Sequence, residues 1–90
     1  MPYIKERHRN IFKRHLDEMP AIDEPGELNY LITSLCGQYL HQHEFNYMHI
    51  NDVIGVLECA KLELYRRLAA PYEDGKALEN GDLPLYAGRQ

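Results

Sequence analysis

The stretch that decides the fold is Ile50–Ala70, which reads INDVIGVLECAKLELYRRLAA. Its apolar residues recur at intervals of three, four and seven positions, which places them on one face of an α-helix. They are Ile50, Val53, Ile54, Leu57, Leu64 and Leu68. About twenty residues at a rise of 1.5 Å make a rod of roughly 30 Å, the diameter of a small domain. The stretch therefore predicts one long amphipathic helix that forms the spine of the fold.

Residues at both ends of this stretch predict where the helix begins and ends. Asn51 is a favoured N-cap residue, and Asp52 follows in the first turn, where a negative charge complements the helix dipole. Pro71 predicts the end, because proline disfavours a helical conformation in the residue before it. We therefore expect a helix over about 51–70.

Shorter patterns predict the other elements. A clean apolar stripe follows Pro25 and predicts a helix over about 26–42, and a thinner stripe predicts one over about 5–18. Proline at a first helical position, as at Pro71, predicts a short fourth helix over about 71–80. No stretch has the alternation of a strand. The predicted class is all-α, a compact bundle of three main helices (about 5–18, 26–42, 51–70) plus a short fourth helix (about 71–80).

The domain organisation follows from the length of the chain. Ninety residues suit a single helical domain over 1–90, with an extended C-terminal tail from about residue 82. The short connection between the second and third helices favours antiparallel packing, with the first helix covering their groove. A chain this short has a limited core, and oligomerisation is a common remedy.

Composition and charge limit the kinds of partner that we expect for the chain. The net charge of −4 gives no general attraction to nucleic acid or to anionic membranes, so nucleic acid is an unfavoured partner. No apolar run approaches the roughly 18 residues that span a bilayer, and the N-terminus has no signal-peptide pattern, so we expect no membrane association. Cys36 and Cys59, neither in a CxxC pair, are expected to be reduced core residues. These features predict a cytoplasmic protein.

A second face of the helix over 26–42 bears on oligomerisation. It carries Tyr30, Ser34, Gly37 and His41. This face is either an ordinary solvent face or a surface on which another helix packs, within the fold or across a dimer. Together with the small core and the seven tyrosines, it leads us to expect a homo-oligomer, with a dimer favoured.

A polar line crosses the apolar face of the long helix. Lys61 falls near the middle of that face, and Glu58 and Tyr65 flank it at i, i+3, i+7. In one interpretation Lys61 lays its stem on leucines and reaches water, or pairs with Glu58. In the other, the three residues form a partly buried cluster that lines a pocket or a subunit interface.

Residues near Pro71 extend this line into a candidate site. A turn at Pro71 would bring Tyr72 and Glu73 back toward the end of the long helix, beside Arg66. Cationic donors and aromatic rings suit a small anionic or planar ligand. The same cluster could instead close a structural network or a dimer contact. The ligand or interface candidates are Glu58, Lys61, Tyr65, Arg66, Tyr72 and Glu73.

The chain shows no recognisable catalytic or metal-binding pattern. His41 and His43 point about 200° apart on a continuous helix and could share a metal only if the helix ended between them. We expect surface or capping histidines, no metal site, no cofactor and no catalytic residues. No glycine-rich phosphate loop and no nucleophile beside a base are present in the sequence, so we lean away from an enzyme.

Four ordered blocks resemble a known family. They are PGELNYLIT, IGVLECAKLELYRR, APYED and ENGD, which lie between Pro25 and Asp82. The MPYI start is similar too. The chain resembles a family of short, uncharacterised proteins from prokaryotes and their phages, and the resemblance implies no particular activity. The histidine-rich segment 41–49 departs from the pattern of that family.

The functional expectation follows from these patterns together. We expect a non-enzymatic cytosolic interaction or regulatory module that acts as a homo-oligomer. The alternative is a small-ligand or nucleotide-handling protein, which includes a metal-dependent hydrolase.

Overall fold

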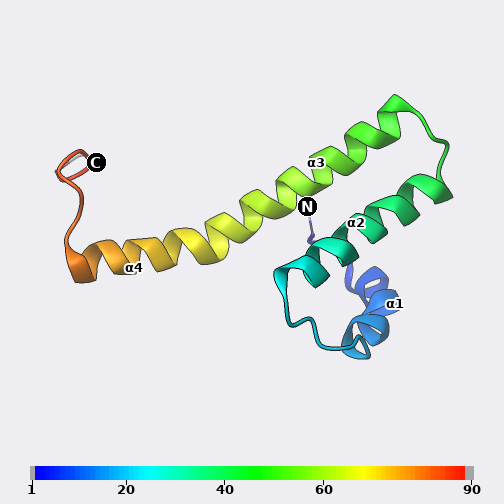
Figure 1. The fold of residues 1–90 in the computed structure, drawn as a ribbon, viewed down its shortest axis with the longest axis horizontal. Coiled ribbons are helices and arrows are strands. Elements are labelled where there is room, and N and C mark those ends of the chain that lie inside the picture. The colour runs from blue at the N-terminus through cyan, green and yellow to red at the C-terminus, as the bar shows by residue number, and fades with distance from the viewer. Residues whose placement is uncertain (1, 89–90) are drawn as a thin grey trace. The chain divides into compact units, whose positions relative to one another are not determined.

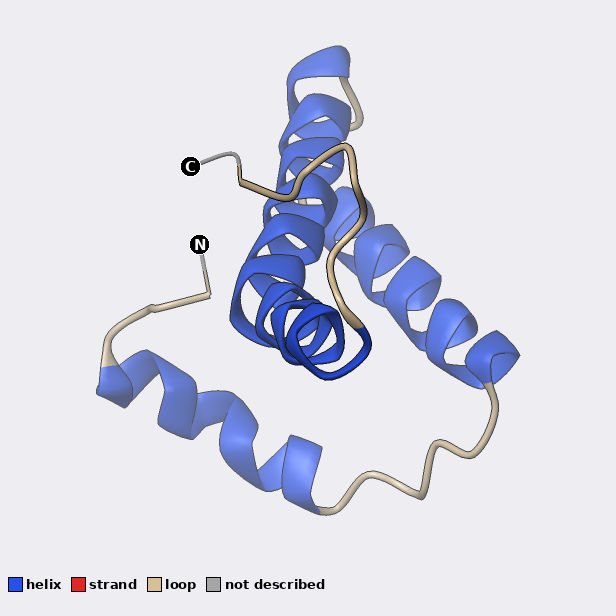
Figure 2. Cartoon of the chain, turned by 90° about the vertical axis from the view of Figure 1, so that its left-hand side faces the viewer, coloured by secondary structure: helices blue, strands red, loops and turns tan. Residues whose placement is uncertain are grey.

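The computed structural model describes residues 2–88, and regular structure in this range is entirely helical (Figures 1 and 2). The elements are α1 (Glu6–Asp17), α2 (Pro25–Gln42), α3 (Tyr47–Leu64), the π-helix η1 (Tyr65–Ala69) and α4 (Ala70–Asn80). The predicted all-α class is therefore confirmed. The chain divides into two units, unit 1 (Met1–Leu57) and unit 2 (Glu58–Gln90). No helix among the described residues is long and apolar enough to cross a membrane.

The start of α2 is fixed by a capping box. Glu24 is the N-cap residue, and Pro25 lies in the first turn. The N–H groups of the first turn have no acceptor within the helix, so the missing N–H of proline costs no helical hydrogen bond. The Glu27 carboxylate accepts the backbone N–H groups of Asp23 at 2.8 Å and Glu24 at 2.9 Å. Because these donors have no partner within the helix, the carboxylate stabilises this helix start. The predicted boundaries of 26–42 are confirmed to within a residue.

Helix α3 begins four residues earlier than its sequence pattern predicts. The Oδ1 atom of Asn46 accepts the backbone N–H of His49 at 2.9 Å, the hydrogen bond of an N-cap residue. Asn51 therefore lies inside the helix, and its predicted role as the cap is wrong. Asn46 and Asn51 are both favoured N-cap residues. Asn46 is the N-cap because residues Tyr47–Ile50 continue the helical spacing of the apolar residues.

The predicted helix end at Pro71 is also wrong, because the helical backbone runs without a break from Tyr47 to Asn80. Proline removes one N–H, and its ring crowds the carbonyl four residues earlier, here that of Arg67. The wider turns of η1 precede this point, and the N–H of Ala70 bonds the carbonyl of Tyr65, five residues back. The π-helix thus carries the chain past the proline. Pro71 lies in the first turn of α4, as expected for the short fourth helix.

In unit 1, the chain reverses between α2 and α3 (Figure 1), and residues of both helices line an apolar hollow of about 190 Å³. The lining residues are Leu35, Cys36, Tyr39, Asp52, Val53 and Val56. No residue of α1 lines it, so α1 does not provide the cover that we expected. None of the described residues is buried. Cys36 is half-buried and Cys59 is exposed, so the prediction of a core position is wrong for Cys59.

Helix α4 ends at Gly81, which has a φ of 89°. This positive φ favours glycine, which has no Cβ to clash with the backbone. The N–H groups of Tyr86 and Ala87 both bond the carbonyl of Leu83, at 3.0 and 2.9 Å, and close a turn over residues 84–88.

Candidate functional site

Glu58 and Lys61 form a salt bridge at the start of unit 2. The Nζ atom of Lys61 lies 3.1 Å from Oε1 of Glu58, one helical turn away. The two side chains are 55% and 68% exposed, so water screens the pair and it contributes a few tenths of a kcal/mol. Lys61 was predicted to lie in the apolar face of the long helix, and its side chain reaches water in this structure.

Tyr65 and Glu73 are neighbours in unit 2. The pKa of the Tyr65 hydroxyl is raised, first because it hydrogen bonds the Glu73 carboxylate and second because that carboxylate is negatively charged. Desolvation and the charge of Asp74 raise the pKa further. Ionising the phenol would remove the donor and place two negative charges together, so the neutral phenol is favoured.

The π-helix explains how residues eight positions apart meet. In a regular α-helix such residues point about 80° apart. A π turn closes over five residues instead of four, so each residue of η1 turns the chain through a smaller angle. This smaller rotation between Tyr65 and Glu73 brings the two side chains toward one face. The sequence predicts their approach by a bend at Pro71, whereas the structure achieves it within a continuous helix.

The other two candidates have different partners. The guanidinium of Arg66 binds the carboxylate of Glu63 at 2.7 Å. The ammonium of Lys76 lies 5.8 Å from the centre of the Tyr72 ring, a distance at which a cation and an aromatic ring attract. The six candidates are therefore placed as two internal pairs, Glu58 with Lys61 and Tyr65 with Glu73, while Arg66 and Tyr72 bind residues outside the set.

Lys76 is a residue that our sequence analysis missed. It lies one turn after Tyr72, and its Nζ atom is 3.4 Å from a carboxylate oxygen of Glu79. A shallow hollow on α4 is lined by Pro71, Tyr72, Gly75, Lys76 and Glu79. The i, i+4 spacing of a tyrosine and a lysine is the signal that could have identified it.

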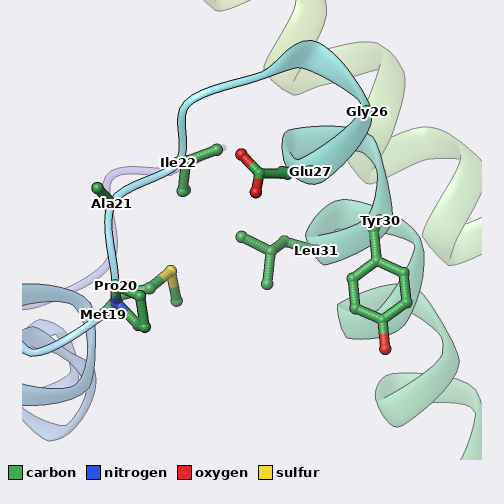
Figure 3. A pocket seen from close by; sticks show the side chains of 8 residues that line it. All are labelled: Met19, Pro20, Ala21, Ile22, Gly26, Glu27, Tyr30 and Leu31. Carbon is green, nitrogen blue, oxygen red and sulfur yellow. The ribbon is translucent and has the colours of Figure 1, made fainter.

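A second hollow lies in unit 1, where the connection after α1 meets the start of α2 (Figure 3). Its volume is about 380 Å³, and Glu27, Tyr30 and Leu31 line its α2 side. The Glu27 carboxylate already accepts the two hydrogen bonds of the capping box, so the hollow offers mainly apolar surface. Tyr30 was predicted to belong to the second face of the helix over 26–42, and its place beside this connection was not predicted.

An aromatic cluster joins the end of α2 to the start of α3. The rings of Tyr39 and His43 stack with their centres 4.1 Å apart, and the His49 ring lies 5.2 Å from that of His43. From the sequence we considered His43 with His41 instead, because the predicted helix over 51–70 did not include His49. Among residues 2–88, no group of three or more histidine, cysteine, aspartate and glutamate side chains is placed to hold a metal ion.

Comparison with known proteins identifies a family and no individual relative. No curated protein and no solved structure matches the chain. A family model described as Domain of unknown function (DUF6899) matches residues 1–83, nearly the whole chain. This match agrees with the resemblance of the sequence blocks to an uncharacterised family. The chain belongs to the family described as Domain of unknown function (DUF6899).

Proposed function

We propose that the chain is a cytoplasmic interaction module that acts as a homo-oligomer, with a dimer as its basic form. One observation carries the proposal: none of the described residues is buried, although α2 and α3 both have apolar faces. Apolar surface that stays in water contributes nothing to stability, and large apolar patches mark sites of association.

Part of the exposed apolar surface of unit 1 lies at the hollow that α2 and α3 share. Leu35 lines the hollow on α2 and is 57% exposed, and Val56 lines it on α3 and is 63% exposed. Covering such side chains contributes about 25 cal/mol for each Å² removed from water. A partner helix that fills the hollow would therefore supply a core for unit 1.

A second copy of the chain is the partner that suits this surface. A two-fold interface places the same patch of both subunits in contact, so a charged patch would repel itself. The apolar stripe of α2 carries no charge, although Asp52 of α3 also lines the hollow. It consists of Leu28, Leu31, Ile32, Leu35, Cys36 and Tyr39.

Sedimentation equilibrium at micromolar concentration tests the proposal. We expect the natural chain to have about twice its monomer mass of 10.6 kDa. Leu35→Glu should reduce the mass to that of the monomer, because a two-fold interface would bring two unpaired carboxylates into apolar surroundings. Leu78→Glu is the matched control, since Leu78 on α4 is 89% exposed and its substitution should leave the mass unchanged. A natural chain that remains at 10.6 kDa throughout overturns the proposal.

A second candidate function is the binding of a small anionic ligand by unit 2. It is favoured by η1, because π-helical turns occur frequently at functional sites. Lys61, Arg66 and Lys76 supply cationic groups near this segment, and each is exposed and paired with a carboxylate that a ligand could displace. Anionic ligands of the nucleotide class fit such donors.

A thermal-shift screen of nucleotides and inorganic phosphate distinguishes this candidate. A ligand at a hundred times its Kd stabilises the folded state by about 2.7 kcal/mol. Lys61→Met should abolish such a shift while leaving the stability of the ligand-free chain within about 0.5 kcal/mol, since its salt bridge is exposed. If no compound shifts the melting temperature, unit 2 is not a nucleotide or phosphate site.

A further inference from the structure

Two histidines of unit 1 meet at the connection between α2 and α3. His43 is the C-cap residue of α2, and His49 lies in the first turn of α3. Their ring centres are 5.2 Å apart and the ring planes are inclined by 52°.

Hydrogen bonds to the main chain determine which nitrogen of each ring carries the proton. Nδ1 of His43 lies 2.7 Å from the carbonyl oxygen of Tyr39, and Nδ1 of His49 lies 2.5 Å from that of Glu44. A carbonyl oxygen can only accept, so both Nδ1 atoms must donate. In the neutral imidazole, Nε2 then has a free lone pair. Metal-binding histidines commonly have this arrangement, with the other ring N–H bound to a carbonyl or carboxylate.

The spacing of the rings matches that of two imidazoles on one tetrahedral ion. A zinc–nitrogen distance of about 2.0–2.1 Å and a ring radius of about 1.2 Å place each ring centre about 3.2 Å from the metal. At the tetrahedral angle, the two centres are then about 5.2 Å apart. The observed separation is 5.2 Å.

Neighbouring groups hold the pair in this arrangement. Tyr39 stacks on the His43 ring at 4.1 Å and meets the His49 ring edge-on at 6.4 Å. The cap formed by Asn46 fixes the backbone of His49. Rings that are oriented before binding lose less conformational freedom when a ligand binds.

We propose that His43 and His49 bind a divalent transition-metal ion of the zinc, cobalt or nickel class through their Nε2 atoms. Imidazole is a favoured ligand of these ions. Water fills the other two positions of a tetrahedral ion, and the single pair of each chain binds one ion. This site is independent of the proposed oligomer, because all of its protein ligands come from one chain.

Calorimetric titration of Zn²⁺ into the metal-free full chain tests the site. We expect one ion per chain, and an affinity that falls at acidic pH because only neutral imidazole binds metal. His43→Gln and His49→Gln should each weaken binding by at least about tenfold. His41→Gln and His15→Gln are matched controls that remove a histidine outside the pair and should retain the natural affinity. Equal affinity of His43→Gln and the natural chain, or half an ion per chain, overturns the proposal.

A measurement on the natural chain keeps the test independent of how the variants fold. Nitrogen NMR of the five imidazoles distinguishes Nε2 from Nδ1. Zn²⁺ should shift the Nε2 signals of His43 and His49 and leave those of His8, His15 and His41 in place. If Zn²⁺ shifts all five rings equally, or none, the assigned site is wrong.

Discussion

At the scale of single residues, the Tyr65 hydroxyl interacts with the Glu73 carboxylate, eight positions further along the same continuous helix. The raised pKa of Tyr65 means that the folded chain holds this proton more tightly than the unfolded chain does. The hydrogen bond therefore contributes to stability below the pKa of tyrosine in unfolded chains, about 10. The contribution is lost as the pH rises through the higher pKa of the folded chain.

Ultraviolet titration of tyrosinate tests this bond. Glu73→Gln should lower the pKa of Tyr65, because it removes the charge that opposes ionisation. The difference between the titration curves of the natural chain and of Tyr65→Phe gives the contribution of Tyr65, separate from that of the other six tyrosines. Glu79→Gln alters a carboxylate that binds Lys76 and should leave the curve unchanged. An unshifted curve for Glu73→Gln would show that the two side chains are apart in solution.

The sequence predicts local pairs better than distant ones. Glu58 and Lys61 are three residues apart on a helix, and this spacing alone places them in contact. The approach of Tyr65 and Glu73 depends on the rotation of the intervening backbone, and the spacing of the two residues alone does not specify that rotation. The His43–His49 pair depends on where α3 begins, and the two asparagines at 46 and 51 left that start ambiguous.

At the scale of secondary structure, Pro71 and η1 form one feature. Because Pro71 has no N–H, the carbonyl of Arg67 cannot have its usual α-helical donor. The π-helix ends directly before this point and shifts the hydrogen bonds by one residue. Its place in the chain is therefore explained by the proline that follows.

Pro71→Ala should convert η1 toward α-helix, since alanine restores both the donor and the space for a regular turn. The change in rotation should separate Tyr65 from Glu73 and lower the pKa of Tyr65, as measured by the same tyrosinate titration. Pro84→Ala, in the turn after α4, is a control for the general effect of losing a proline. A pKa of Tyr65 that remains raised in Pro71→Ala would show that the π-helix has another cause.

Boundaries of the helices were predictable where strong caps and prolines agree. At α2, the apolar stripe, Pro25 and Glu27 all indicate the same start, and the capping box confirms it. At Pro71 the usual rule is that a helix ends before proline. The rule fails here because the wider turns of the π-helix carry the helical backbone past the proline.

At the scale of the whole molecule, apolar residues without cover are the dominant feature. The patterns that predicted amphipathic helices do not specify what covers the apolar face. An amphipathic pattern indicates that the apolar face of a helix needs a surface to pack against. The pattern does not indicate whether that surface belongs to the same chain. Whether residues 1–90 fold as one domain remains a prediction.

Leu35→Ala measures whether association provides that cover. In a single chain Leu35 is 57% exposed, and truncating an exposed leucine changes the free energy of unfolding by less than about 0.5 kcal/mol. In the proposed dimer it is buried, and the cost should be about 2–5 kcal/mol. Chemical unfolding at several protein concentrations measures this cost, and the midpoint should rise with concentration. Leu78→Ala is the control. Equal small effects of both substitutions would mean that Leu35 stays in water.

The lack of any buried residue among residues 2–88 has a consequence for the lifetime of the chain. Amide hydrogens exchange slowly, and peptide bonds resist proteases, where opening the structure requires cooperative loss of a packed core. Without such a core, the helices of a single chain open one turn at a time, and each opening exposes backbone to solvent and to proteases. In the proposed oligomer, slow exchange and resistance to cleavage would therefore appear only above the concentration at which chains associate.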